Sequence, residues 1–307
     1  MDIHTKIIEL YCAVCDHYDN TLVVHAQRQS NNFCPKFTDT ECMTTYIWGI
    51  FNQKFEVKAC YEFIRDYYGD WFPDLPSYQA YNNRICFLAD AIKELASLFI
   101  CDAGIDPDHS DFVIDSLPII VAGAKRSGRA KVAPEMCNKG YCASKEMWYY
   151  GVKLHVLAQC NHKSLPTPAN MVISKASEHD LPIAKDELLD GVNNIILFGD
   201  TAFADKEWQD YMLSEHNVEI ITPIKRKKGQ KKLDYWDGIF SAAVSSVKQV
   251  IESFNNWIIE KTNIQRASKV RSTAGLTAFI LAQHQNPSLT KEQKKTGKTL
   301  GNQIFCS

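Results

Sequence analysis

The sequence contains no run of about 18 apolar residues, so no part of it is long and apolar enough to span a membrane. Its first residues, MDIHTKIIEL, lack the basic and then apolar pattern of a secretory signal. No Gly-x-x-x-x-Gly-Lys-Ser/Thr loop for nucleotide phosphates occurs. There is also no internal repeat and no long low-complexity segment. We therefore expect a globular cytoplasmic protein without a phosphate-binding loop of that type.

The cysteine count is odd, with eleven scattered along the chain. Because no export signal precedes them, we expect reduced thiols rather than disulfides. Cys12 and Cys15 lie on an apolar helix pattern, which favours core packing. Zinc binding is the alternative for two groups: Cys12, Cys15, Cys34 and Cys42, and Cys137 with Cys142.

The net charge is small, at −2, but it is unevenly distributed. Residues 1–107 carry 8 Lys/Arg and 15 Asp/Glu, a net charge of −7, whereas the rest carry 26 and 21, a net charge of +5. A polyanionic partner would be attracted to the second part. The length of 307 residues and the 45% hydrophobic content allow about two packed domains.

The first hundred residues have helical periodicity throughout. Apolar residues form a stripe over 1–17, and Thr38 and Glu41 have the spacing of a capping box before an apolar run at 43–51. Another helix is predicted over 57–68, and Ser77 can cap a long helix that reaches about Ile100. These patterns predict an all-helical N-terminal domain over 1–107, with a helix-turn-helix-like arrangement as one alternative.

The pattern then changes to strands that alternate with helices. Strands are predicted at 112–115, 148–158, 169–173, 194–198 and 218–222, and helices at 178–189, 205–215 and 242–262. This order indicates an α/β domain over 108–283, a mixed sheet with flanking helices. The remaining residues, 284–307, form a polar, Lys-rich tail.

Three acidic residues stand out within this domain. Asp115 and Asp200 each follow an apolar strand pattern, and Glu252 lies beside the apolar face of a predicted helix. A carboxylate at the end of a central strand is held rigidly and faces a crevice. Three such acids suit two Mg²⁺ ions, with Mn²⁺ as a substitute, which together favour in-line displacement at phosphorus. Each acid alone is more simply a turn cap or a solvated side chain.

Four segments, in this order along the chain, favour a catalytic role for the three acids over these simpler roles. They are the strand FVIDSLP at 112–118, the strand YGVKLH at 150–155 with ASEHD at 176–180, the segment LFGDTAF at 197–203, and Lys248-x-x-x-Glu252 followed by Trp257, Lys261, Arg266 and Arg271. With these segments, residues 37 to 283 resemble the DDE transposases of bacterial insertion sequences. Ser245, Lys248 and Ile259 stand where many relatives have Tyr, Arg and Lys.

The resemblance implies a ribonuclease H-like catalytic domain with Asp115, Asp200 and Glu252 as its metal-binding triad. It also implies an enzyme of the bacterial nucleoid that cuts terminal inverted repeats and joins them to target DNA, as a homodimer on the DNA. For residues 1–107 it implies a role in binding DNA ends or in oligomerisation. Support for the site is expected from Lys153, His155, His179 and Asp180, and DNA contacts from Lys248, Lys261 and Arg271.

Several of these residues also have simpler interpretations. His155 fits a hydrogen-bonded positioning role better than metal binding, and His179 with Asp180 fits a helix cap. Trp257 is more simply a core residue than a stacking platform for a base. Two basic loops are expected to contact DNA phosphates, with solvated surface as the alternative: Lys125, Arg126 and Arg129, and Lys225, Arg226, Lys227, Lys228, Lys231 and Lys232.

Two other functions remain open at this point. A metal-dependent nuclease of the same fold would cut DNA without joining it. A transposase-derived DNA-binding protein would bind DNA without cutting it, although it would not need the three acids.

Overall fold

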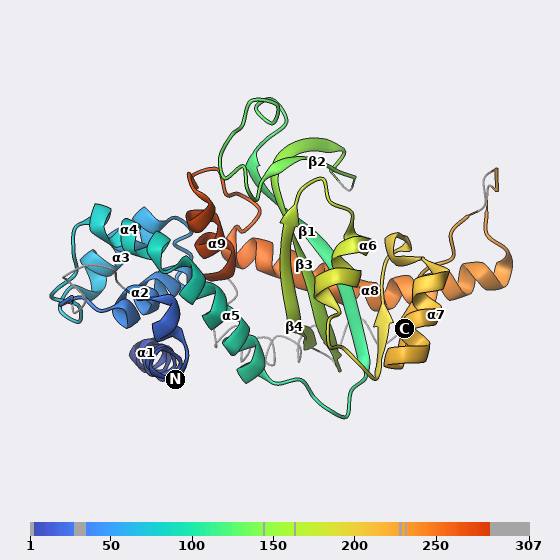
Figure 1. Cartoon of the computed structure of the whole chain (residues 1–307), viewed down its shortest axis with the longest axis horizontal. Helices are drawn as coiled ribbons and strands as arrows, with labels where there is room; N and C mark the ends of the chain where they lie inside the picture. Colours follow the sequence, from blue (N-terminus) through green and yellow to red (C-terminus); the bar gives the residue numbers. More distant parts are fainter. Residues whose placement is uncertain are drawn as a thin grey trace.

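A computed structural model describes residues 3–27, 35–143, 145–162, 164–226, 229–230 and 232–282. A group of helices lies at one end of the molecule and a twisted sheet with its own helices at the other (Figure 1). Among the described residues, none of the helices combines the length and apolar character needed to cross a membrane.

The helical part begins with α1 (Ile3–Asn20) and a short 3₁₀ turn, η1 (Leu22–His25). It continues with α2 (Asp39–Phe51), α3 (Val57–Tyr68), α4 (Tyr78–Phe87) and α5 (Ala89–Ala103). The amphipathic patterns explain these helices: in α3, Cys60, Ile64 and Tyr68 recur every four residues and are buried. The expected capping box is present at the start of α2, where Thr38 and Glu41 bond to each other's backbone amides.

The expected helix from Ser77 to about Ile100 is wrong in one respect. Ser77 does cap a helix, since its hydroxyl accepts from the amide of Ala80, but α4 ends at Phe87 and α5 starts at Ala89. Leu88 between them is fully buried. The break therefore places a large apolar side chain in the core of the helical part.

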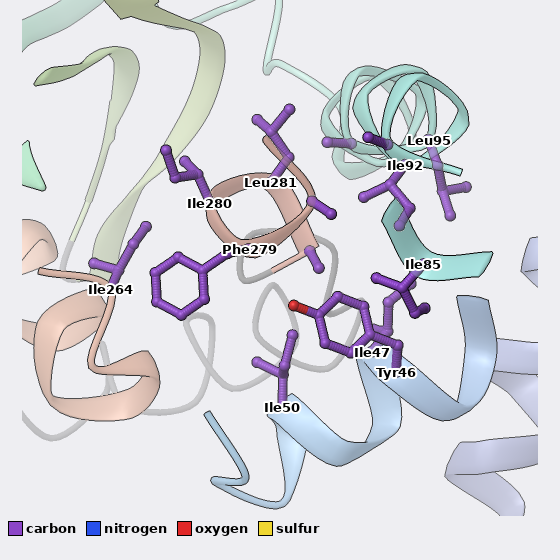
Figure 2. Close-up of a cluster of buried hydrophobic side chains, with 14 of the residues drawn as sticks. Tyr46, Ile47, Ile50, Ile85, Ile92, Leu95, Ile264, Phe279, Ile280 and Leu281 are labelled. Atoms are coloured by element: carbon purple, nitrogen blue, oxygen red, sulfur yellow. The ribbon is translucent and has the colours of Figure 1, made fainter. Parts of the chain in front are cut away.

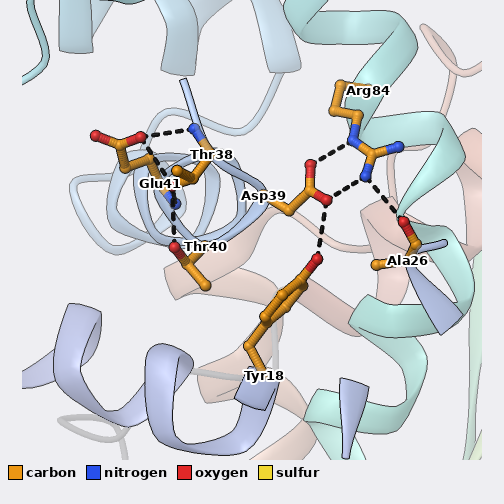
Figure 3. A network of polar contacts seen from close by, with 7 residues as sticks. All are labelled: Tyr18, Ala26, Thr38, Asp39, Thr40, Glu41 and Arg84. Carbon is orange, nitrogen blue, oxygen red and sulfur yellow. Dashed lines mark hydrogen bonds and ion pairs between the residues drawn. The ribbon is translucent and has the colours of Figure 1, made fainter. Parts of the chain in front are cut away.

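A polar network ties the start of α2 to its neighbours (Figure 3). Asp39 accepts a hydrogen bond from the hydroxyl of Tyr18 at 3.0 Å and is paired with the guanidinium of Arg84. Arg84 also donates to the backbone carbonyl of Ala26 at 3.2 Å. Asp39 is 8% exposed, so its charge depends on these partners.

The last described helix, α9 (Thr273–Ala282), belongs spatially to the helical part (Figures 1 and 2). It packs against α5, α4 and α2. Figure 2 shows Phe279 and Ile280 of α9 near Tyr46, Ile50 and Ile92 in one buried cluster. The chain therefore returns to the first hundred residues after it has built the sheet.

The sheet has six strands: β1 (Asp111–Ala122), β2 (Asn138–Cys142), β3 (Met147–Asn161), β4 (Ser164–Lys175), β5 (Ile195–Phe198) and β6 (Val218–Ile221). The strand order is β2-β3-β1-β5-β6, and β4 also pairs with β3. β1 is antiparallel to β3, whereas β5 and β6 continue the sheet in parallel. This confirms a mixed sheet with flanking helices.

Helices cover both faces of β1. The long helix α8 (Tyr235–Thr262) contributes Ile251, Phe254 and Ile258 to the cluster that contains Val113 and Leu117 of β1. The opposite face, with Phe112 and Ile114, packs against α6 (Asp180–Ile183), the π-helical turn η2 (Ala184–Leu188) and α7 (Lys206–His216). Alternation along the strand assigns Asp115 to the α8 face.

Some expected elements differ from the observed ones. β1 runs seven residues beyond Asp115, so this acid lies within the strand and not at its end. The expected helix at 178–189 is a single α-helical turn followed by the π-helical turn, α8 starts earlier than expected, and the sequence patterns did not indicate β2 or α9. The extra strand length comes from pairing with β3, which spans β1 almost completely.

No disulfide joins the described cysteines, and within the described ranges no cluster of His, Cys, Asp or Glu has the arrangement of a metal site. The expected core packing is wrong for Cys12, which is exposed, and Cys15 is only partly buried, whereas Cys42, Cys137 and Cys142 are buried. Cys34 lies outside the described residues. Core packing is thus the observed role of three of these thiols.

Candidate active site

Asp115 and Asp200 come together where β1 and β5 run in parallel. Phe112 and Val113 of β1 pair with Leu197 and Phe198 of β5. Continuing this register by two residues brings Asp115 level with Asp200, just after β5 ends. Burial is the largest cause of the raised pKa of Asp115, and the negative charge of Asp200 adds to it, as expected for neighbouring carboxylates.

Helix α8 contributes two polar contacts to this pair. The ammonium of Lys248 lies 3.8 Å from Oδ1 of Asp200. Seven residues later, the amide Nδ2 of Asn255 donates to Oδ2 of Asp115 at 2.9 Å. Lys248 and Asn255 are two helical turns apart, so they share one face of α8. That face is therefore directed at both acids.

Asn255 was missed by the sequence analysis. It is a buried polar residue, and its carbonyl oxygen Oδ1 has no hydrogen-bond partner among the described residues. The available signal was an amide at the helical spacing of Lys248 and Glu252, between apolar residues on a buried helix face. A buried acceptor without a donor is costly unless something else satisfies it.

Glu252 lies on the same face of α8, four residues after Lys248 and three before Asn255. Its side chain is exposed and makes no hydrogen bond or ion pair with any described residue. No cluster of three metal-ligating side chains is found in the described part of the chain. The fold thus gathers two of the three expected acids and leaves the third nearby on α8.

Burial is the main influence on Asp115. It raises the pKa of this carboxyl to about 6, and the charges of Asp180 and Asp200 act in the same direction. A hydrogen bond from the backbone of Ser116 and the charge of Lys248 act in the opposite direction. The ionised carboxylate is therefore poorly stabilised by its surroundings, and a bound cation would stabilise it.

Asp200 is more accessible, with 57% of its side chain exposed. Its Oδ1 accepts from the backbone amide of Thr201 at 2.6 Å, at the start of the 3₁₀ turn η3 (Thr201–Phe203). The simpler role of a turn cap is thus present. The cap leaves the other carboxylate oxygen available.

The four supporting residues do not all act as expected. The ammonium of Lys153 donates to Asp180 at 3.0 Å and to the carbonyl of Glu178 at 2.8 Å. Asp180 is therefore held by Lys153. The neighbouring His179 occupies the N-cap of α6 without a side-chain cap bond to any described residue. His179 itself contributes no such cap bond, whereas Asp180 lies in the first turn of α6, as expected for an acid near the N-terminal amides.

His155 has a structural role. It is 1% exposed, and its Nε2 lies 2.8 Å from the hydroxyl of Ser174 on β4. Its Nδ1 lies 3.8 Å from Asp180. Burial lowers the pKa of His155 to about 4, so the ring is neutral at pH 7. The neutral ring of His155 therefore links β3 to β4 through Ser174 and lies beside Asp180.

The donor set fits a hard divalent cation in part. Asp115 and Asp200 supply two carboxylates on adjacent strands, and Mg²⁺ needs one or two together with phosphate and water oxygens. The unpartnered Oδ1 of Asn255 is a further oxygen beside Asp115. In the described part of the chain, the polar contacts of these two carboxylates with other residues include no thiol or imidazole, which disfavours softer metals; they are to Asn255, Thr201, Lys248 and the backbone of Ser116.

The residues expected to contact DNA are mostly exposed. Lys125, Arg126 and Arg129 lie on the loop after β1, and Lys225, Arg226 and Lys232 lie between β6 and α8; all six are exposed. Lys261 and Arg271 are also exposed, whereas Lys248 is largely buried against Asp200. Lys227, Lys228 and Lys231 lie outside the described residues.

Trp257 packs in the core, as the simpler interpretation predicted. Its ring stacks on that of Phe254, with centroids 6.3 Å apart and planes inclined at 20°. It contacts the large buried cluster from a partly buried position. A role in base stacking is therefore not available to this face of the ring.

Comparison with known protein families identifies the domain that contains these acids. A family model described as "Transposase DDE domain" matches residues 106–303, which is more than half of the chain. No curated protein matched the chain. The matched region starts just before β1 and includes every strand and all three expected acids.

Proposed function

The chain belongs to the transposase DDE domain family, and on this basis we propose that it is the DNA transposase of a bacterial insertion sequence. Its proposed reaction is hydrolysis of a phosphodiester bond at each transposon end, followed by attack of the freed 3′-hydroxyl on target DNA. The observation that supports this most strongly is that the parallel register of β1 and β5 brings Asp115 level with Asp200, where Asn255 and Lys248 of α8 contact them. The family implies a ribonuclease H-like core, and the mixed sheet is consistent with it.

We assign the triad to Asp115, Asp200 and Glu252, with the first two as the principal metal ligands. These residues would hold Mg²⁺, or Mn²⁺ in its place, which would stabilise the charge on the phosphate oxygens and lower the pKa of an attacking water. Asp115 is held in orientation by the amide of Asn255. Asp200 is held by the amide of Thr201 and by Lys248. Glu252 faces the same region from α8 and completes the site when DNA is bound.

Asp180 contributes as a neighbour. Its charge acts on Asp115, and Lys153 fixes its position. A fixed negative charge beside the two acids strengthens the attraction of the site for cations. We therefore assign Lys153, His155 and Asp180 to positioning, and not to direct contact with the reacting phosphate.

The substrate is DNA, as the family implies. The exposed basic residues of the two loops are suited to phosphate contacts: Lys125, Arg126, Arg129, Lys225, Arg226 and Lys232. Two transposon ends must meet before joining, so we propose that the enzyme acts as a homodimer on DNA. The natural end sequences are to be found as short inverted repeats in the DNA that flanks the gene.

The decisive experiment measures cleavage and joining on duplexes that carry these repeats, with and without Mg²⁺. Asp115→Asn, Asp200→Asn and Glu252→Gln are each expected to abolish cleavage while DNA binding survives. Glu187→Gln, an exposed acid of the π-helical turn, is the matched control and should cleave normally.

Each competing function predicts a different result. Cleavage without joined products, even when pre-cut ends are supplied, would indicate a nuclease. Binding without Mg²⁺-dependent cleavage would indicate a DNA-binding protein. Near-normal cleavage by one of the three variants would remove that residue from the site.

A further inference from the structure

A groove separates the helical part of the molecule from the end of α8. Its larger cavity, of about 540 Å³, is lined by residues 53–59 at the start of α3, by α4, and by the segment that joins α8 to α9. A neighbouring cavity of about 500 Å³ shares Phe55, Asn263 and Arg266 with it and extends to Ile120 of β1. The two cavities form one groove between segments that are far apart in the sequence.

The groove is strongly basic. Five basic residues line the larger cavity against a single acid, Glu56: Lys54, Lys58, Arg266, Lys269 and Arg271. Lys145 and Glu260 line the smaller one. Residues 1–107 carry a net charge of −7, yet two of their eight basic residues line this groove. The acidic helical part is thus locally positive where it faces the catalytic part.

These basic side chains are only lightly engaged. Within the described part of the chain, Lys54, Arg266 and Lys269 have no ion pair with an acid. Lys58 lies 3.7 Å from Glu62, an exposed pair of small energetic value. Arg271 donates to the carbonyls of Ser268 and Val270 and keeps its charge. The positive charge therefore remains available to an external anion.

Two helices also begin at this groove. Val57, Lys58 and Ala59 form the first turn of α3, and the N-cap residue Glu56 makes no side-chain cap bond to any described residue. α9 starts at the groove as well, after Ser272. The first amides of a helix and its dipole favour anions. The carboxyl end of α8, at Asn263, acts in the opposite direction, and the neighbouring Arg266 and Lys269 compensate for it.

The position of the groove fits a DNA duplex that also reaches the two acids. The backbone of Ile120 bonds to Gln265 and Ala267, which places Arg266 against the far end of β1. Five residues separate Ile120 from Asp115, or about 17 Å of extended strand. Successive phosphates of a DNA strand are about 3.4 Å apart along the helix axis, so this distance corresponds to about five nucleotides.

We propose that this groove binds the phosphodiester backbone of duplex DNA, about five nucleotides from the phosphate at Asp115 and Asp200. The inference rests on the proposed function for the identity of the polyanion. Lys54 and Lys58 give the helical part a direct contact with DNA. Arg266 and Lys269 contact the DNA from the opposite wall of the groove.

The test uses the full chain and a DNA duplex of about 30 base pairs, with affinity measured between about 50 and 200 mM salt. Two variants remove charge from the two walls: Lys54→Ala with Lys58→Ala, and Arg266→Ala with Lys269→Ala. The matched control removes the same charge from exposed positions of α5 and α7, with Lys93→Ala and Lys206→Ala. Lys54→Arg with Lys58→Arg keeps the charge and separates its loss from side-chain packing.

Each groove variant is expected to bind DNA more weakly. The slope of log affinity against log salt should become less steep by about 1.8, or 0.9 for each lost phosphate contact. The control and the Arg variant should keep the wild-type slope. Groove variants that differ no more than the control would overturn the inference. Binding of inorganic phosphate at the groove with unchanged DNA affinity in the variants would also overturn it, because the site would then serve a small anion.

These measurements distinguish a failure of the groove inference from a failure of the proposed function. If the wild type cleaves DNA but the groove variants keep its salt slope, the groove inference fails and the transposase proposal stands. If the wild type binds DNA without Mg²⁺-dependent cleavage and the groove variants lose binding, the groove inference stands and the catalytic proposal fails. A wild type that binds no DNA contradicts both.

Discussion

Asp115→Asn is expected to stabilise the fold while it removes activity. Burial raises the pKa of the Asp115 carboxyl from 3.8 to about 6. Above pH 6 the group is ionised in both the folded and the unfolded state, so the folded state bears the full cost of the buried charge. Below about pH 3 the group is protonated in both states and that cost disappears. As the pH rises between the unfolded and the folded pKa of Asp115, the unfolding free energy of the wild type therefore falls below that of the variant.

The size of the effect follows from the shift. A pKa difference of about 2 units corresponds to about 3 kcal/mol of unfolding free energy at pH 7.5, and roughly half of that at pH 5. An asparagine at position 115 has no charge to desolvate, and its carbonyl can still accept the hydrogen bond from Asn255 that Asp115 accepts now. For a chain of this size each kcal/mol changes the melting temperature by roughly 2–4 °C, so the difference amounts to several degrees.

The assay is denaturant unfolding of the wild type and the variant at pH 7.5 and pH 5, in the absence of divalent metal. Asp200→Asn is the control, because Asp200 is exposed and replacing it should cost less than about 1 kcal/mol. Millimolar Mg²⁺ should reduce the difference between wild type and Asp115→Asn, since a cation stabilises the charged carboxylate. Equal stability of the two proteins at both pH values would refute the burial argument.

Three further predictions concern other contacts. Asn255→Ala should raise the Mg²⁺ concentration needed for half-maximal cleavage, because Asp115 loses its positioning donor; an unchanged Mg²⁺ titration would contradict this role. Arg84→Ala should cost about 3 kcal/mol in urea unfolding, since it removes the guanidinium that pairs with the buried Asp39, and Arg84→Lys should recover part of the loss. Neutralising the exposed Lys225, Arg226 and Lys232 should weaken binding to all DNA sequences alike, with a smaller salt dependence, and an unchanged salt dependence would identify these residues as solvated surface.

Local patterns in the sequence were sufficient for most of the elements. The capping box at Thr38, the helix at 57–68 and the strand at 195–198 depend on residues a few positions apart, so periodicity and capping chemistry predict them well. The alternation of strands and helices likewise indicated a mixed sheet. The order of four motifs led to the family that residues 106–303 match.

The tertiary structure alone decided what the acids meet. The hydrogen bond between Asn255 and Asp115 joins residues 140 positions apart, and no local pattern specifies such a partner. Chain-distant packing also lengthened β1 beyond Asp115 and brought α9 back to the first helices. The basic groove likewise depends on bringing Lys54 beside Arg266. Periodicity reports which face of an element is buried; the neighbour that buries it is selected by the packing of the whole chain, because apolar burial is not directional.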